Sequence, residues 1–505
     1  MAARRVRLGA EARALLARIF ACARQPTWLV GGAIRDAALG RPLGDLDLAC
    51  ADARSLAARL ARAFQGTLVT LDEKNAVYRL ALIPARGKAI HQIDIAGLQG
   101  KTIVEDLARR DFTVNAVALE LVDDLPASLP ETAFLDPRKG LKDLADGVIR
   151  ADVEGNLDDD PLRLLRAFRI AAQLGLSIEE KTLKAIGRRK KLIGVPAPER
   201  VSAELLLLLA APGAAPWLNR MDECGLLTTV LPELEPSRRC AENYYGPGGV
   251  LKHTLDVCAR VDFLLTNLRA IYPGLASDLE AHFAARGGPP FRALLLLSAL
   301  LHDVAKPATA RKIDGRLRFF EHDTKGAAAT GKILRRLRLS RDQIDTASAI
   351  VRHHLRPGHL AAAGPLTERG AYRFFRDLGP DAPGLLIVCW GDHSSYMTEA
   401  SLKRLLKSRP PAQFAGGASP PYGATAAARK TARHLQLIST LLLRWRDMTR
   451  APAPERLLDG RDVMKALNIP PGPRIGEILE RVREAQAEGT IKNRDEALAL
   501  ISRLK

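Results

Sequence analysis

The sequence predicts an α+β fold, with a small mixed-sheet unit at the N-terminal end and a helical remainder. Two observations support this prediction. Short apolar runs bounded by turn residues occur in roughly the first 125 residues, whereas beyond about residue 140 the apolar spacing is almost entirely helical. A chain of 505 residues is also too long for one hydrophobic core, and its 47% hydrophobic content can supply several.

The order of these patterns divides the chain into five expected segments. Pro/Gly clustering marks a linker before the last of them. The segments are a mixed-sheet head (1–150), a helical neck (151–240), a second helical domain (241–408), the linker (409–430) and a helical tail (431–505). The strands expected in the head are residues 29–30, 46–48, 68–71, 77–83, 90–95 and 114–121.

Charge and cysteine content limit which classes of partner and which cellular compartment are expected. Lys and Arg total 76 against 57 Asp and Glu, and the net charge of +19 favours a polyanionic partner. The six cysteines include no Cys-x-x-Cys pair, so neither a disulfide framework nor a zinc–thiolate site is expected. No apolar run reaches the roughly 18–20 residues of a membrane span. We therefore expect a cytoplasmic protein without a membrane partner, and we interpret the Arg-rich residues 1–24 as an ordinary first helix rather than a transit peptide.

The first motif combines a strand, a double-glycine turn and a pair of acids. Trp28–Val30 predicts a strand that ends at Gly31 and Gly32, whose backbone amides can approach a phosphate where the next helix begins. Asp45 and Asp47 lie in the following apolar run, and residues two apart on a strand point to the same face. Two carboxylates held this close favour a cation between them. Beside a phosphate cradle, they predict Mg²⁺ and phosphoryl or nucleotidyl transfer.

A third carboxylate completes a two-metal set. Asp94 lies in the alternating run His91–Ile95, which predicts a strand with this acid on one face. In two-metal transfer one ion activates the attacking 3′-hydroxyl and both stabilise the departing pyrophosphate, so catalysis consists of positioning and charge neutralisation. The candidate catalytic residues are therefore Asp45, Asp47 and Asp94.

Two further motifs follow along the chain. Arg109–Ala116 is a basic stretch that leads into an apolar run, and Asp158–Arg166 places three acids and Pro161 at an expected helix start. Asp160 and Arg163 are three residues apart and are expected on one helix face. One acceptor and a fork of donors can bond the edges of cytosine and adenine. This pair is therefore a candidate for selecting nucleotides without a template.

The ordered set of motifs resembles the class II nucleotidyltransferases, the family of tRNA CCA-adding enzymes and bacterial poly(A) polymerases. The resemblance covers residue 28 to about residue 235, and residues 470–489 resemble the C-terminal part of long bacterial CCA-adding enzymes. It departs at Asp159, where the family has Glu. By resemblance, the three acids of the head hold Mg²⁺. The implied nucleotide-binding residues are Gly31, Gly32 and Arg35 for the triphosphate, Arg110, Asp111 and Asn115 for the ribose and nucleotide, and Asp160, Arg163 and Arg166 near the base.

Five of the ten histidines form an ordered series with two acids in the middle of the chain. His302–Asp303 follows the apolar run 293–301 and is expected to cap a buried helix, with Lys306 one turn further on, where its ammonium can meet a phosphate. The series resembles the HD phosphohydrolase superfamily, in which His and Asp ligands hold divalent metals. By that resemblance the ligands are His253, His302, Asp303 and Asp392 for a first metal, and His322 with His353 for a second, His354 being the open alternative to His353.

Mixed imidazole and carboxylate ligands suit Ni²⁺, Mn²⁺, Co²⁺, Fe²⁺ or Zn²⁺ better than Mg²⁺ alone. A metal-activated water at such a site hydrolyses phosphomonoesters or 2′,3′-cyclic phosphates. The resemblance therefore implies two separate metal centres, Mg²⁺ in the head and a transition metal in the helical domain.

The function implied by the resemblance is template-independent addition of C, C and A to tRNA 3′ ends, from CTP and ATP. Narrower alternatives are a poly(A) polymerase, although Gly66–Val69 lacks the Gly-Arg-Arg-Phe pattern associated with bacterial poly(A) polymerases, or an enzyme that adds only CC or only A. A loop near residues 70–90 is expected to decide between these specificities. An alternative from another class is an HD phosphohydrolase whose inactive head binds RNA. The oligomeric state stays open.

Overall fold

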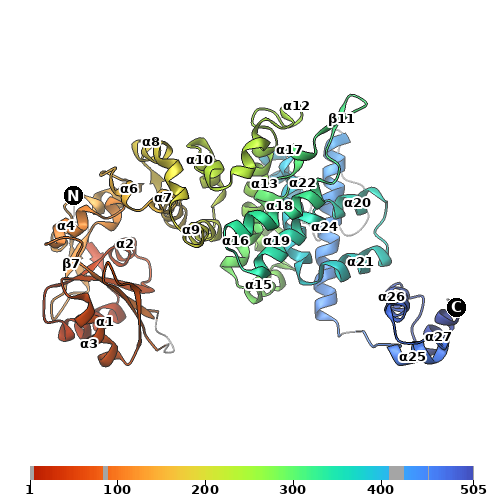
Figure 1. The fold of residues 1–505 in the computed structure, drawn as a ribbon, viewed down its shortest axis with the longest axis horizontal. Coiled ribbons are helices and arrows are strands. Elements are labelled where there is room, and N and C mark those ends of the chain that lie inside the picture. The colour runs from red at the N-terminus through yellow and green to blue at the C-terminus, as the bar shows by residue number, and fades with distance from the viewer. Residues whose placement is uncertain (1–4, 84–88, 409–425, 453, 504–505) are drawn as a thin grey trace. The chain divides into compact units, whose positions relative to one another are not determined.

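The computed structural model describes residues 5–83, 89–408, 426–452 and 454–503 (Figure 1). The chain forms two compact units. Unit 1 comprises Met1–Leu205 and Met221–Val230, and unit 2 comprises Leu206–Arg220 and Leu231–Lys505. Unit 1 contains a mixed sheet and unit 2 is almost entirely helical, so the α+β prediction is confirmed. The boundaries between head, neck and helical domain stay predictions.

A six-stranded mixed sheet forms the centre of unit 1. Its strand order is β4-β5-β6-β3-β2-β7. The central pair of β3 and β6 is parallel and every other neighbouring pair is antiparallel. The strands are β2 (Thr27–Val30), β3 (Asp45–Cys50), β4 (Thr67–Asp72), β5 (Val77–Ala81), β6 (Gln92–Gly97) and β7 (Ala118–Glu120).

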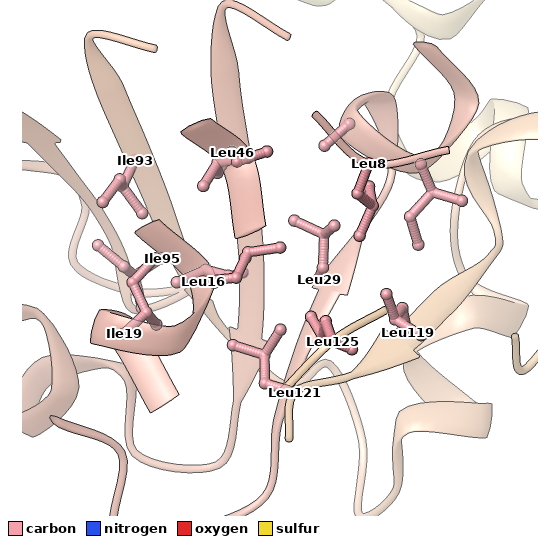
Figure 2. Packing of buried hydrophobic residues seen from close by; sticks show 14 of the residues in the cluster. Leu8, Leu16, Ile19, Leu29, Leu46, Ile93, Ile95, Leu119, Leu121 and Leu125 are labelled. Atoms are coloured by element: carbon pink, nitrogen blue, oxygen red, sulfur yellow. The ribbon is translucent and has the colours of Figure 1, made fainter. Parts of the chain in front are cut away.

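Side-chain alternation along the strands gives the sheet two different faces. Figure 2 shows Leu16 and Ile19 of α1 (Ala10–Cys22) packed on one face, against leucine and isoleucine side chains such as Leu46 and Ile93. Val30 and Ala49 instead join a smaller cluster on the other face. Because residues two apart share a face, the acids of β3 and β6 lie on the side opposite α1. The core therefore fixes the direction in which these acids point.

One predicted strand is partly wrong. Residues 114–121 begin in the 3₁₀ turn η1 (Thr113–Asn115), and only Ala118–Glu120 is strand. The Thr113 hydroxyl donates to Asp143 and the Asn115 amide donates to Asp111, so local polar side chains hold the backbone in a turn. The apolar pattern did not reveal this competition.

The remaining elements of unit 1 are short strand pairs and the helices that cover the sheet and continue beyond it. The strand pairs are β1 (Arg5–Arg7) with β8 (Ser128–Pro130), and β9 (Val148–Ile149) with β10 (Ser177–Ile178). The helices are α2 (Gly32–Ala38), α3 (Ala53–Phe64), α4 (Ile103–Ala108), η2 (Glu131–Ala133), α5 (Gly140–Ala145), α6 (Asn156–Asp159), α7 (Arg163–Leu174), α8 (Glu180–Arg189), η3 (Lys190–Gly194) and α11 (Leu227–Val230). The helix α9 (Pro198–Ala210) begins in unit 1 and ends in unit 2.

Unit 2 is built around a helix that is apolar on all sides. In α16 (Pro289–Leu301) ten of the thirteen residues are buried, and two prolines in the first turn start the helix. This helix packs against α13 (Gly249–Thr266), α19 (Arg341–His353) and α22 (Ala382–Ser395). Because α16 is surrounded, the residues at its C-terminal end are delivered to the interior of the unit.

The other elements of unit 2 enclose this core and extend to the C-terminal part of the chain. They are α10 (Ala215–Glu223), η4 (Pro232–Arg239), α12 (Glu242–Tyr245), α14 (Leu268–Ile271), α15 (Ala276–Ala285), α17 (Lys306–Thr309), β11 (Arg311–Ile313), β12 (Arg316–Arg318), α18 (His322–Arg336), α20 (Arg356–Ala362), α21 (Glu368–Leu378), η5 (Gly379–Asp381), α23 (Glu399–Ser408), α24 (Ala426–Arg450), α25 (Gly460–Leu467), α26 (Pro473–Ala487) and α27 (Arg494–Ser502).

The expected linker and tail divide differently from the sequence prediction. Residues 409–425 lie outside the described part of the chain, and residues 426–430 belong to α24, which packs against α22. Only α25, α26 and α27 form a cluster of their own, around side chains such as Val463 and Ile501. The helix α26 begins at Pro473, directly after Gly472. None of the described helices is both long and apolar enough to traverse a bilayer.

Candidate active site and candidate metal centre

The three candidate catalytic acids occupy neighbouring positions on the sheet of unit 1. Asp47 of β3 and Asp94 of β6 are direct partners in the parallel ladder, and Asp45 lies two residues before Asp47 on the same face. Burial and, to a smaller extent, the negative charges of Asp45 and Asp94 raise the pKa of the Asp47 carboxyl to about 6, against the opposing effect of Arg110. The sheet therefore holds an acid in surroundings that disfavour its charge unless a cation is supplied.

An arginine that was not predicted from the sequence extends this row of acids. Arg79 of β5 is the ladder partner of Asp94, and its guanidinium donates to both carboxylate oxygens, at 2.8 Å each. The hydrogen bonds to Asp94 raise the pKa of Arg79 above its usual value. The strand alternation in Val77–Ala81 was a signal for which way Arg79 points, but the sequence gave no register between β5 and β6.

The two glycines of the first motif border the same acids. Gly31 has a φ of +67°, a conformation that favours glycine. A Cβ atom at Gly31 would lie 3.0 Å from an Arg110 guanidinium nitrogen, and one at Gly32 would lie 3.4 Å from a carboxylate oxygen of Asp47. The backbone of the turn, which carries no side chains at these two glycines, therefore lies close to one carboxylate and to two guanidinium groups. The second guanidinium is that of Arg35, which has a nitrogen 3.4 Å from where a Cβ atom at Gly32 would lie.

A chain of hydrogen bonds joins the three sequence motifs. Arg35 donates to the Asn115 side-chain oxygen at 2.9 Å, and the Asn115 amide donates to Asp111 at 2.9 Å. Asp111 also accepts from Arg166 of α7, at 3.3 Å. The Arg166 guanidinium in turn bonds Glu204 of α9. Four of the predicted nucleotide-binding residues, Arg35, Asn115, Asp111 and Arg166, therefore form one connected network.

The buried acid in this network is stabilised as a carboxylate. Burial raises the pKa of Asp111, but the Arg166 charge, the Asn115 amide and the Phe112 N–H outweigh it, so the pKa of Asp111 lies below its usual value. Arg110, the preceding residue, donates to Asp106 at 3.0 Å. Asp111 is therefore a charged acceptor held in place by three donors.

The candidate base-selecting pair does not share one helix. Asp160 has extended backbone (φ −137°, ψ 95°) between α6 and α7, and α7 begins at Arg163. The expectation of one helix face is therefore wrong, because the chain breaks at Asp160 and Pro161. The Asp160 carboxylate lies 3.7 Å from both Arg166 and Arg200.

Arg163 is only partly satisfied by the protein. One of its terminal nitrogens donates to the Asn156 carbonyl at 2.7 Å. Its Nε is buried without a hydrogen-bond partner among the described residues. A buried donor without a partner is costly, so this guanidinium is suited to a ligand that supplies an acceptor.

Unit 2 contains a second cluster, in which one carboxylate lies between two sets of imidazoles. The Asp303 Oδ2 atom lies 3.1 Å from His302 Nε2 and 3.6 Å from His253 Nε2. Its Oδ1 atom lies 3.5 Å from His322 Nε2 and 3.7 Å from His354 Nε2. The cluster comprises two groups able to hold a metal ion, His253, His302 and Asp392 in one and Asp303, His322 and His354 in the other.

The imidazoles are oriented by backbone carbonyls. The Nδ1 atoms of His302, His322 and His354 lie 2.6–2.7 Å from the carbonyls of Ala299, Phe319 and Val351, an arrangement that leaves each Nε2 lone pair directed at the cluster. Four buried atoms there have no hydrogen-bond partner among the described residues: His253 Nε2, His302 Nε2, His322 Nε2 and Asp303 Oδ1. Such a set of nitrogen and oxygen atoms, each with a free lone pair to offer to a metal ion, fits a divalent metal centre.

Two details of the cluster differ from the sequence prediction. The structure places His354 in the cluster, while His353, the residue named first for the second metal, is half-buried outside it. Only one of two adjacent helical residues can face inward at the C-terminal end of α19. Lys306, expected to face a phosphate, donates to Asp303 and, at 2.8 Å, to the Tyr245 hydroxyl.

The electrostatics of the cluster favour ligand forms of its residues. Although burial raises their pKa values, the neighbouring imidazoles keep the pKa of Asp392 and of Asp303 below the usual value, and Lys306 adds to this effect at Asp303. Burial lowers the pKa of His354 to about 4, which favours the neutral imidazole that a metal requires. Tyr245 and Tyr396, which the sequence did not single out, pack their rings against His253.

Four family models match successive parts of the chain. They are the Poly A polymerase head domain (residues 27–150), the RNA and SrmB-binding site of polymerase A (175–237), the HD domain (269–397) and tRNA nucleotidyltransferase domain 2 (436–501). Proteins matched by the head and HD models generally use divalent metals, which agrees with the acids of unit 1 and the cluster of unit 2.

Relatives match over nearly the whole chain. An A-adding tRNA nucleotidyltransferase of Deinococcus radiodurans is 32% identical over 94% of this chain and 94% of its own length. A CC-adding tRNA nucleotidyltransferase of Thermus thermophilus is 31% identical over 94% of this chain and 92% of its own. The structure of a Thermotoga maritima CCA-adding enzyme complexed with tRNA has a TM-score of 0.61 at 19% identity, covering 99% of this chain and 97% of that one, which shows a shared fold.

Proposed function

Because the chain belongs to the tRNA nucleotidyltransferase family, we propose that it adds C, C and A to tRNA 3′ ends from CTP and ATP, without a nucleic-acid template. The observation that carries this proposal is the hydrogen-bonded network that joins all three sequence motifs beside the paired acids Asp47 and Asp94. A head that had lost its catalytic activity and only bound RNA would have no reason to keep this set of carboxylates and guanidiniums together.

In the proposed reaction the head positions two substrates and balances charge. Asp45, Asp47 and Asp94 are the residues that hold Mg²⁺, which when bound activates the tRNA 3′-hydroxyl and neutralises the triphosphate. Gly31 leaves room for the triphosphate beside the acids because it carries no side chain. Arg35, whose guanidinium lies beside Gly32, offers it to the phosphate oxygens.

The ribose and the base are read by the other end of the network. Asn115 and Asp111 present amide and carboxylate groups, which suit ribose hydroxyls that donate and accept. The unpartnered Nε of Arg163 is the donor that we assign to the base edge, with Asp160 as the acceptor held by Arg166 and Arg200. Base choice is then made by protein side chains alone.

A narrower activity is the second candidate. Relatives that match over more than nine-tenths of this chain include one A-adding and three CC-adding enzymes. This observation favours an enzyme that performs one part of the CCA addition, with a second enzyme performing the other. Residues 84–88, within the loop region expected to decide specificity, lie outside the described part of the chain.

Extension of three tRNA transcripts separates these activities. Transcripts that end before the first C, before the second C and before the final A are each incubated with Mg²⁺ and one labelled nucleotide. We expect stepwise C, C and A addition by the native chain and none by Asp45→Ala or Asp47→Ala, whereas Asp123→Asn, which changes an exposed loop carboxylate, keeps full activity. Incorporation of C alone or A alone establishes the narrower activity, and activity in Asp45→Ala contradicts the proposal.

For unit 2 we propose a two-metal phosphohydrolase. The support is the pair of three-residue groups that share the neighbourhood of Asp303, with Nε2 atoms directed inward. Nitrogen-rich ligands favour Ni²⁺, Mn²⁺ or Co²⁺ over Mg²⁺, and bound metal lowers the pKa of a water that attacks phosphorus. Metal analysis of the purified chain should find transition metal that is lost in His302→Ala. The native chain should hydrolyse bis-p-nitrophenyl phosphate, and hydrolysis that survives complete metal removal contradicts this assignment.

The compartment that we propose is the cytoplasm. Its support is the set of tRNA nucleotidyltransferases to which the chain is similar, since tRNA processing requires access to newly made or damaged tRNA. Localisation of a tagged full-length chain by microscopy and fractionation tests it.

A further inference from the structure

A small β-hairpin connects two parts of the metal cluster. β11 and β12 follow α17, which begins at Lys306, and precede α18, which begins at the ligand His322. Figure 1 shows this hairpin projecting from the helices of unit 2. Every residue of its strands is exposed, so it contributes nothing to the core of the unit. A feature that protrudes in this position needs an explanation other than packing.

The hairpin carries four cations and one anion. The cations are Arg311, Lys312, Arg316 and Arg318, and the anion is Asp314 in the turn. Arg311 is the direct partner of Arg318 in the ladder, and Ile313 is the partner of Arg316, so three guanidiniums share one face. None of the four cations has an ion pair or side-chain hydrogen bond within the part of the chain that the structure describes.

Like charges placed opposite each other destabilise a ladder, so this arrangement is unfavourable for the hairpin by itself. A row of phosphates removes that cost, because each guanidinium can bond phosphate oxygens and release counterions from the chain that carries them. The face of Arg311, Arg316 and Arg318 is therefore complementary to a polyanion.

The base of the hairpin is attached directly to the cluster. The Phe319 carbonyl lies 2.6 Å from Nδ1 of the ligand His322. The Phe319 ring lies 5.6 Å from Lys306 Nζ, measured to its centroid. An anionic chain that follows the guanidiniums is therefore led to the metal ligands rather than across an unrelated surface.

Two exposed aromatic side chains belong to segments that adjoin the cluster. Phe320, at the base of the hairpin, is 63% exposed, and Tyr244 of α12 is 72% exposed. Tyr244 contacts Tyr245 edge to face, and the Tyr245 ring stacks on His253. Exposed rings cost hydration energy unless something covers them, and unpaired nucleobases stack on such rings regardless of sequence.

We propose that the hairpin and these aromatic residues bind the single-stranded 3′ end of an RNA and direct its terminal phosphate to the metal cluster. The proposal rests on the phosphohydrolase function proposed above and names its substrate class. For a 2′,3′-cyclic end, water adds its oxygen to phosphorus, one phosphorus–ribose oxygen bond breaks, and the water proton passes to the ribose oxygen released. No oxidant or second substrate is needed.

The test compares an RNA substrate with a small one. The variant Arg311→Gln/Arg316→Gln/Arg318→Gln removes the basic face, and Lys332→Gln/Arg341→Gln/Arg352→Gln removes three exposed cations from α18 and α19 as a matched control. Full-length proteins loaded with Mn²⁺ are assayed on a ten-nucleotide RNA with a 2′,3′-cyclic end and on bis-p-nitrophenyl phosphate. We expect the hairpin variant to lose at least tenfold on RNA and less than twofold on the small ester, and the control to keep both rates.

Salt dependence and aromatic substitution give independent measures. Loss of three phosphate contacts should make the plot of log affinity against log salt less steep, with its negative slope reduced in magnitude by about 2 for a single strand. Tyr244→Ser/Phe320→Ser should weaken RNA binding at least fivefold without changing hydrolysis of the small ester. Equal loss in the hairpin and control variants, an unchanged RNA rate, or equal binding of a blunt RNA duplex overturns the proposal.

A crosslinking experiment separates this proposal from the phosphohydrolase function. RNA ending in 4-thiouridine is irradiated with the native chain, and the attached peptides are identified by mass spectrometry. Crosslinks to residues 311–320 or to Tyr244 support the binding surface even if the native chain hydrolyses neither substrate, a result that would reject only the phosphohydrolase. Absence of these crosslinks overturns the surface even if the small ester is hydrolysed.

Discussion

The two candidate metal-binding regions of this chain are built on opposite principles. In unit 1, arginines face the acids: Arg79 bonds both oxygens of Asp94, and the Arg110 charge acts on Asp47. In unit 2, the cluster leaves the Nε2 atoms of His253, His302 and His322 buried without a hydrogen-bond partner among the described residues. The first arrangement suits ions that arrive with a charged substrate, and the second suits ions that stay with the protein.

The largest expected effect is that a substitution in either region abolishes the activity of that region and leaves the activity of the other unchanged. Asp94→Asn should lower tRNA extension at least about 10³-fold, because a carboxylate is lost where charge must be neutralised, and leave hydrolysis of bis-p-nitrophenyl phosphate unchanged. His302→Ala should do the reverse. Rates of both reactions measured on both variants check this, and a variant that loses both activities would show that the sites depend on one another.

A smaller effect is expected at the arginine that faces Asp94. Arg79→Gln should lower tRNA extension about 10- to 100-fold, as substitutions that misplace a metal ligand do. The loss should appear mainly as weaker binding of Mg²⁺, so that the rate reaches half its maximum at a higher Mg²⁺ concentration. Arg79→Lys should recover part of the lost activity. An unchanged Mg²⁺ dependence would mean that Arg79 does not position the carboxylate.

Metal removal should separate the regions in stability. Chelation should lower the melting temperature of unit 2 by about 8–16 °C, given that metals bound at a thousand times their dissociation constant contribute roughly 4 kcal/mol. Withdrawal of Mg²⁺ should change the unit 1 transition far less. Calorimetry of the full chain with and without EDTA measures both, and an equal shift of the two transitions would contradict the comparison.

The smallest effect is a pH-dependent gain in stability. The pKa of Asp47 in the folded chain, about 6, lies above its ordinary value of 3.8, so between these pH values the folded state binds a proton that the unfolded state has lost. Stability of the metal-free chain should therefore fall as pH rises from about 4 to 6 and stay low above that. Asp47→Asn removes the penalty. It should raise the melting temperature by about 6–12 °C at pH 8 and hardly at all at pH 4. A gain that is the same at both pH values would contradict the assignment.

Sequence reasoning succeeded where the chain itself carries the spacing. The strand alternation placed Asp45 and Asp47 on one face, and the apolar run before His302 predicted a buried helix that presents this residue to the interior. It failed where tertiary register or a local turn decides. The pairing of Arg79 with Asp94 depends on strands joined by a long connection, and the break at Asp160 interrupts an otherwise helical pattern.

The choice between His353 and His354 shows the same limit at finer scale. Two adjacent histidines at the end of a helix are the same residue type and lie at nearly the same sequence distance from every other motif. Only the packing of α19 against α18 and α16 decides which imidazole faces the cluster.

The bond from Asp111 to Arg166 also bears on how such enzymes can be recombined. Asp111 lies between β6 and β7 of the sheet and Arg166 belongs to α7, so a chimera cut between residues 112 and 162 would pair the acid of one parent with the arginine of another. Under the roles proposed above, the ribose contact and the base contact would be inherited together. Nucleotide choice would then belong to one continuous stretch of the chain rather than to an interchangeable module.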